Sequence, residues 1–97
     1  MKLKPGFVAE YKRRHDEIWQ ELAAELKAAG FYKHSIFLDD EMLTLFTVQK
    51  LDDKNSVAAL PDSLVVRKWW NCMAPLMEVH ADNSPVTIAF CEIFHLD

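Results

Sequence analysis

The segment "AEYKRRHDEIW", residues 9–19, places a tyrosine and a histidine four residues apart. In a helix, positions i and i+4 lie on one face, so Tyr11 and His15 would point the same way. An imidazole has an unperturbed pKa of about 6.5 and can both take up and release a proton near neutral pH. A lone histidine on an apolar helical face is more often a core residue. The neighbouring phenol favours a role in proton transfer.

A second aromatic group occurs in "RKWWNCM", residues 67–73. Consecutive residues of a helix point about 100° apart, so only one of Trp69 and Trp70 can face the core directly. The pair is either a core residue with a partly exposed neighbour, or a platform for the apolar face of a ligand such as a sugar ring. The spacing alone does not decide between them.

The remaining chemically interesting residues favour ordinary structural roles. Lys12, Arg13 and Arg14 have acidic partners at helical spacing, which is typical of a solvated helix face. His80 and Asp82 lie in "HADNSP", where turn chemistry is a better explanation than a metal site. There is no glycine-rich phosphate loop, G-x-S-x-G or HExxH motif, which disfavours a nucleotide-dependent enzyme or a standard hydrolase.

The pattern of apolar residues predicts the elements that would position these side chains. Residues 7–29 have helical periodicity, and Gly30 is a suitable C-terminal stop. Two strands, 33–38 and 42–50, are separated by "DDE" and should form a hairpin. A short helical piece at 56–60 is followed by Pro61.

A second main helix is expected over residues 64–77, with Asp62 or Ser63 as its N-cap. Pro75 should bend or end this helix. Residues 86–96, "VTIAFCEIFHL", are expected to form the last strand, and "MKL" could be the end of a first one.

The resulting order, (β)αββαβ, is the split βαβ arrangement of ferredoxin-like domains. The expected fold is therefore α+β, with one antiparallel sheet and two main helices on one face. The hairpin strands carry apolar residues on both faces, as Ile36 and Phe37 illustrate, and the helices can cover only one. We expect a homodimer that buries sheet against sheet.

The bulk properties bound the class of protein. A chain of 97 residues is one domain, 1–97, and its net charge of -4 does not favour nucleic acid or anionic membranes. No apolar run of 18 residues is present. Cys72 and Cys91 have no zinc or CxxC spacing, which favours two reduced thiols. We expect a soluble protein of the cytoplasm.

Taken together, the motifs are more specific than any one of them. "EYKRRHDEIWQEL", "HSIFLD", "LFTV", "RKWWNCMAPLM" and "DNSPV…EIFHLD" follow one another at separations that resemble those of the L-rhamnose mutarotase family. The resemblance runs from about residue 3 to the end of the chain. It implies a ferredoxin-like fold of the dimeric α/β-barrel type and interconversion of the α and β anomers of L-rhamnopyranose, without a cofactor or a metal.

The resemblance also implies roles for individual residues. His15 would be the general acid, and Tyr11, Trp69 and Trp70 would bind the sugar. The family pattern has a sugar-binding tyrosine on the first hairpin strand, where this chain has His34, so that role is not carried over. The family also begins with a fuller strand than "MKL".

Mutarotation needs an acid at the ring oxygen and a base at the anomeric hydroxyl, which together contribute roughly 10²–10⁴-fold. A bound water, Tyr11 and Asp82 are the candidates for the base. Two other functions fit the same sequence features. One is another enzyme of this architecture, such as a small monooxygenase or a haem-degrading protein, and the other is a non-catalytic sugar-binding module.

Overall fold

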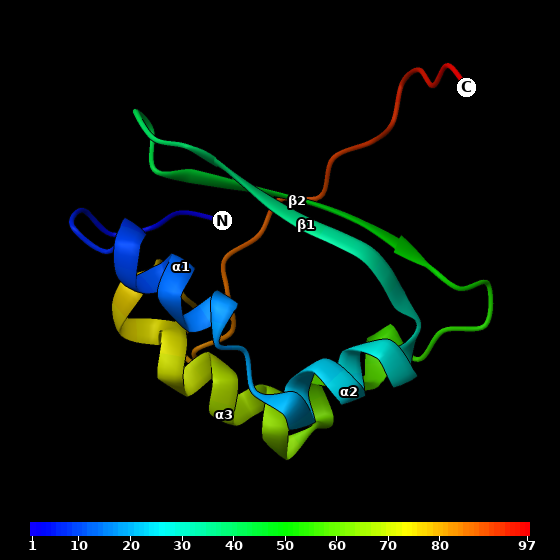
Figure 1. Ribbon diagram of the computed structural model, residues 1–97, viewed down its shortest axis with the longest axis horizontal. Coiled ribbons are helices and arrows are strands. Elements are labelled where there is room, and N and C mark those ends of the chain that lie inside the picture. The colour runs from blue at the N-terminus through cyan, green and yellow to red at the C-terminus, as the bar shows by residue number, and fades with distance from the viewer.

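The computed structural model describes residues 1–97 and places the helices together on one side of a twisted β-hairpin (Figure 1). This confirms the expected α+β class, with one antiparallel sheet covered by helices on one face. The elements, in chain order, are α1 (Val8–Asp16), α2 (Gln20–Ala29), β1 (Phe31–Asp39), β2 (Thr44–Leu51), the 3₁₀-helix η1 (Val57–Asp62), α3 (Leu64–Met73) and the 3₁₀-helix η2 (Ala74–Leu76).

Strands β1 and β2 pair in antiparallel register, which gives the hairpin two distinct faces. Leu38 lies opposite Leu45, which is buried, and this pair belongs to the face that packs on the helices. Phe37 lies opposite Phe46, and both remain exposed. Because side chains alternate along a strand, the first pair defines an inner face and the second an outer face. The expected pair of apolar faces is therefore present.

The single helix expected over residues 7–29 is wrong, because the chain breaks between α1 and α2. Trp19 has extended backbone angles, φ -58° and ψ 133°, and it immediately precedes α2. Its ring packs edge-on against Trp69, with centroids 5.2 Å apart. This contact between distant parts of the chain outweighs the local helical pattern. The second helix does end at Gly30, whose φ of 110° suits glycine.

The second main helix follows the expected pattern closely. Ser63 is the N-cap of α3, and its hydroxyl oxygen accepts a hydrogen bond of 3.3 Å from the amide of Val66. The α-helix ends at Met73, and Pro75 lies in the 3₁₀ turn η2, so the proline does mark its end. The preceding helical piece, η1, runs through Pro61 and does not stop before it.

The first residues of the chain form a short strand-like stub beside β2. Leu3 donates its amide to the carbonyl of Leu43 at 2.9 Å, and Leu45 donates to the carbonyl of Met1 at 2.7 Å. Leu3 also pairs with Met77 on its other side. The stub therefore joins the hairpin to the segment after α3 and closes the core, which consists of Leu3, Tyr11, Leu45, Met73, Leu76 and Met77.

The last strand expected over residues 86–96 does not form within this chain. The amide of Val86 still bonds to the carbonyl of Glu78 at 3.3 Å, but no backbone hydrogen bond follows it. Figure 1 shows this C-terminal segment crossing the hairpin and then leaving the body of the molecule. Its main contact is a stacked pair between Phe46 and Phe90, with centroids 6.0 Å apart. The segment therefore stays extended and forms no ladder with either strand of the hairpin.

No helix in the structure has both the length and the apolar character needed to cross a membrane.

Candidate active site

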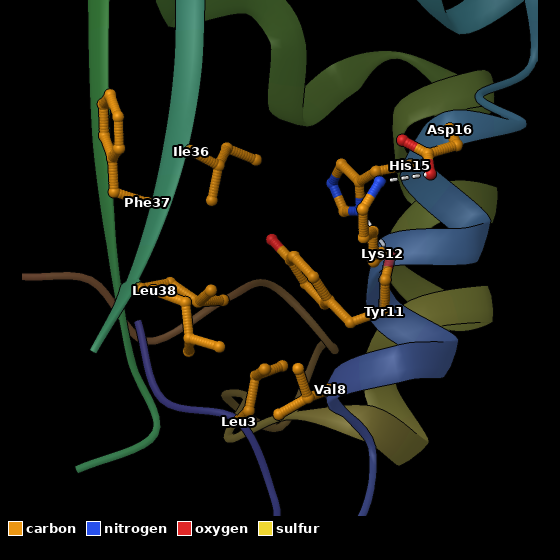
Figure 2. Close-up of a pocket in the computed structure, with 10 residues that line it drawn as sticks. Leu3, Val8, Tyr11, Lys12, His15, Asp16, Ile36, Phe37 and Leu38 are labelled. Atoms are coloured by element: carbon orange, nitrogen blue, oxygen red, sulfur yellow. Dashed lines mark hydrogen bonds and ion pairs between the residues drawn. The ribbon is translucent and has the colours of Figure 1, made fainter. Parts of the chain in front are cut away.

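A cavity of about 300 Å³ lies between α1 and the inner face of the hairpin (Figure 2). This volume is at the lower end of the range for small-molecule sites. Its wall is mainly apolar, with a few polar groups from α1, which is the usual composition of such a site. The lining residues are Leu3, Val8, Tyr11, Lys12, His15, Asp16, Ile36, Phe37, Leu38 and Leu45.

Tyr11 supplies the buried polar group of this cavity. It lies in the middle of α1 on the face that packs on the core, and only 7% of its surface is exposed. Figure 2 shows the phenol pointing from the helix into the cavity, towards the hairpin. Burial raises the pKa of Tyr11 to about 12, because the phenolate would lose its hydration. Near neutral pH the hydroxyl is therefore protonated and can donate a hydrogen bond.

His15 follows Tyr11 one turn later, and its ring is held in a defined orientation. Nδ1 of His15 lies 3.1 Å from the backbone carbonyl oxygen of Tyr11, and the two rings stack with centroids 4.3 Å apart. A carbonyl oxygen can only accept, so Nδ1 carries the proton and Nε2 is left free for exchange. Burial lowers the pKa of His15, since the charged imidazolium is poorly solvated there.

The tryptophan pair is divided by the geometry of α3. Trp69 contacts the ring of His15 edge-on, with centroids 5.3 Å apart and an interplanar angle of 83°. It also lines a second, shallower groove with Trp19 on the other side of α1. Trp70 lines neither hollow and is half-buried on the same helix. The structure therefore brings Trp69, but not Trp70, to the Tyr11–His15 pair.

Sequence reasoning missed two polar residues at the edge of the cavity. Lys12 and Asp16 form an ion pair of 2.6 Å along α1, and both line the cavity (Figure 2). They lie outside the apolar stripe, but α1 ends at Asp16 and its last turn borders the opening. Their i, i+4 spacing on the expected helix could have indicated this ion pair. The inner-face residues Ile36 and Leu38 were also missed, because only the strand register shows that they face α1.

The basic residues of α1 and Asp82 make local polar contacts. Arg14 pairs with Glu10 at 2.8 Å, and Arg13 pairs with Glu17 at the same distance, so this part of α1 is a salt-bridged face. Asp82 accepts a hydrogen bond of 3.0 Å from the amide two residues later, which is turn chemistry. No three His, Cys, Asp or Glu side chains lie close enough together to hold a metal ion.

The fold and the cavity define a class of protein. A small α+β domain encloses an apolar cavity that presents one phenol and one oriented imidazole, which suits proton transfer to and from a small molecule. The chain belongs to the L-rhamnose mutarotase family, because the model described as L-rhamnose mutarotase matches residues 1–96. This decides against the monooxygenase and haem-degrading alternatives.

Individual relatives resemble this chain over nearly its whole length. A protein of Flavobacterium johnsoniae named L-rhamnose mutarotase is 50% identical over 97 residues, which are 100% of this chain and 91% of the relative. One of Brucella anthropi with the same name is 49% identical over 96 residues, covering 99% and 91%.

The crystal structure of L-rhamnose mutarotase from Formosa agariphila superimposes with a TM-score of 0.92 at 43% identity, covering 100% of this chain and 93% of that one. This agreement confirms the fold class predicted from the order of elements.

Proposed function

We propose that this protein interconverts the α and β anomers of L-rhamnopyranose, with His15 as the general acid. The observation that carries the assignment is the His15 ring itself. Its Nδ1 is held by the carbonyl of Tyr11, its Nε2 is free, and it lines an apolar cavity of about 300 Å³. Family membership supports rhamnose as the sugar.

The reaction opens and closes the pyranose ring. A base takes the proton of the anomeric hydroxyl, the bond from the anomeric carbon to the ring oxygen breaks, and protonated His15 gives its Nε2 proton to that oxygen. Rotation about the bond to the new aldehyde carbon exposes its other face. Closure then reverses both proton transfers and yields the other anomer. The mainly apolar cavity strengthens the hydrogen bonds that guide these transfers.

Tyr11 and the tryptophans would hold the sugar. The protonated hydroxyl of Tyr11 can donate to a sugar oxygen, and its pKa of about 12 keeps it a donor. Trp69 supports the ring of His15 from the side, and its own ring is the aromatic surface nearest to that imidazole for the apolar face of a 6-deoxy sugar. Trp70 was expected to share this role. Its position leaves it as the weaker candidate.

Polarimetry tests the proposed reaction directly. Freshly dissolved α-L-rhamnose should reach its equilibrium rotation faster with the protein than with the heat-inactivated protein. An unchanged relaxation rate would favour the non-catalytic sugar-binding alternative, provided that the sugar still binds.

Binding of the sugar can be followed by tryptophan fluorescence. We expect Trp69→Phe to lose the rhamnose-dependent change and Trp70→Phe to keep it, whereas the reverse pattern would assign the platform to Trp70.

We also propose that two copies of the chain form a homodimer. The outer hairpin face exposes Phe37 and Val48, each at 59%, and the C-terminal segment exposes Ile93 at 96%. One molecule thus presents both an uncovered apolar sheet face and an extended segment that lacks a strand partner. A second copy related by a two-fold axis can cover both at once.

Light scattering tests this assembly with the full chain. The expected mass is twice the 11.2 kDa of one chain. Val48→Asp should shift the protein towards the monomer, because it places an unpaired charge in the covered face. A wild-type monomer at micromolar concentration would contradict the proposal.

The cytoplasm is the proposed location, supported by Cys72 and Cys91, which are both free thiols.

A further inference from the structure

The inner face of the hairpin carries a polar pair just beyond the cavity wall. Ile36 and Leu38 line the cavity, and His34 is the next position of the same strand face, about 7 Å along the strand from Ile36. Nδ1 of His34 lies 2.9 Å from Oε1 of Gln49. Gln49 is two residues beyond Thr47, which pairs with Ile36, so it also faces inward.

His34 lies on β1 two residues before Ile36, exposed and just outside the cavity wall that faces His15. Figure 2 shows Ile36 across the cavity from His15, and His34 precedes Ile36 by two residues on β1. The positive charge of His34 contributes to the lowered pKa of His15, which places the two imidazoles within electrostatic reach. A local irregularity at Lys33, whose φ is 49°, shifts the strand register here. Such bulges commonly re-aim a side chain next to an active site.

The two imidazoles are held in the same way. The amide oxygen of Gln49 can only accept, so Nδ1 of His34 donates and its Nε2 keeps a lone pair. His15 has the same arrangement against the carbonyl of Tyr11. The free Nε2 lone pair of His34 can take up a proton while the Nε2 of a protonated His15 gives one up. An acid and its complementary base require one protonated imidazole and one that is not protonated.

The other groups considered for the base are less suited to it. Tyr11 has a pKa of about 12, so its phenolate is rare near neutral pH. Asp82 accepts hydrogen bonds within its own turn and does not line the cavity. Asp16 lines the cavity, but its carboxylate pairs at 2.6 Å with a lysine one turn earlier on α1.

We propose that His34, oriented by Gln49, is the complementary base that exchanges the proton of the anomeric hydroxyl while His15 serves the ring oxygen. In ring opening, Nε2 of His34 takes the hydroxyl proton as His15 gives up its own. In ring closure each proton returns, so no atom or charge is gained over the cycle. This inference rests on the proposed function.

The test replaces His34 by Ala and Gln and measures anomer exchange against rhamnose concentration. Loss of the base predicts a maximal rate lowered by about 10²-fold or more in His34→Ala, with rhamnose affinity changed much less. Added imidazole should restore part of the rate. The maximal exchange rate of Gln49→Leu should lie between those of the wild type and His34→Ala.

Matched variants separate the possible outcomes. His80→Gln makes the same chemical change in a loop that does not line the cavity and should keep the wild-type rate. Full exchange in His34→Ala would overturn the inference. A loss in His34→Ala that appears only in rhamnose affinity would also overturn it. So would a loss of rate in Asp16→Asn that is larger than the loss in His34→Ala. A wild-type protein that does not accelerate exchange would refute the proposed function instead.

Discussion

Replacing His15 with Asn separates a proton-transfer role from a core-packing role. Asn keeps a side chain of moderate size that can still hydrogen-bond, but it cannot titrate. If His15 is the general acid, the maximal exchange rate should fall by roughly 10²–10⁴-fold, which corresponds to about 3–5 kcal/mol in the activation barrier.

The expected loss of stability is smaller and can be worked out from the contacts of the ring. The substitution removes the stack on Tyr11, at 4.3 Å, and the edge contact with Trp69, at 5.3 Å. Such aromatic pairs contribute about 0.5–1.5 kcal/mol each. The carbonyl of Tyr11 remains bonded within α1, so no buried acceptor is orphaned. The free energy of unfolding should therefore fall by about 1–3 kcal/mol.

Both quantities are measured on the same sample, with exchange followed by polarimetry and unfolding followed in urea. His80→Gln is the control for the loss of a histidine elsewhere in the chain. A stable His15→Asn protein with full activity would refute the assignment. A variant that loses stability but keeps its activity per folded molecule would show that His15 is a core residue.

Four further outcomes are expected. The pKa of His15 is lowered by burial from an unfolded value of 6.5, so below that pH the unfolded chain binds the proton first. The free energy of unfolding should fall as pH drops from 6.5 to the lower folded pKa, and His15→Asn should lose this component in urea titrations at several pH values. Tyr11→Phe should weaken rhamnose binding in calorimetry about tenfold, from the loss of one hydrogen bond. Ser63→Ala should lower stability by about 1 kcal/mol, since the capping bond to Val66 is lost. Gly30→Ala should lower the melting temperature, because φ is 110° and a Cβ would lie 2.8 Å from Cβ of Asn55.

The sequence predicted those parts of the fold that depend on local signals. The hairpin and the capped second helix follow from residue periodicity and from Ser63, and the structure confirms them. The break before α2 was missed because Trp19 turns out of the helix to meet Trp69, which is 50 positions away. The strand expected over residues 86–96 was wrong, since this segment pairs with neither strand of the hairpin.

The residues of the site also divide into those that local spacing predicts and those that only the structure identifies. Tyr11 and His15 could be paired from their spacing alone, because i, i+4 neighbours meet on any helix. Ile36 and Leu38 could not be assigned to the cavity until the register showed which strand face looks at α1. The same is true of the tryptophans, since only the packing of α3 shows that Trp69 is the one beside His15.

The most direct test of the central claim is NMR saturation transfer at equilibrium. One anomeric proton of L-rhamnose is saturated and the signal of the other anomer is observed, with and without protein. Our account predicts that wild-type protein carries saturation from one anomer to the other at a rate proportional to its concentration. His15→Asn at equal concentration should leave the transfer near the level of buffer. Bound rhamnose with no transfer above buffer for the wild-type protein would contradict the account.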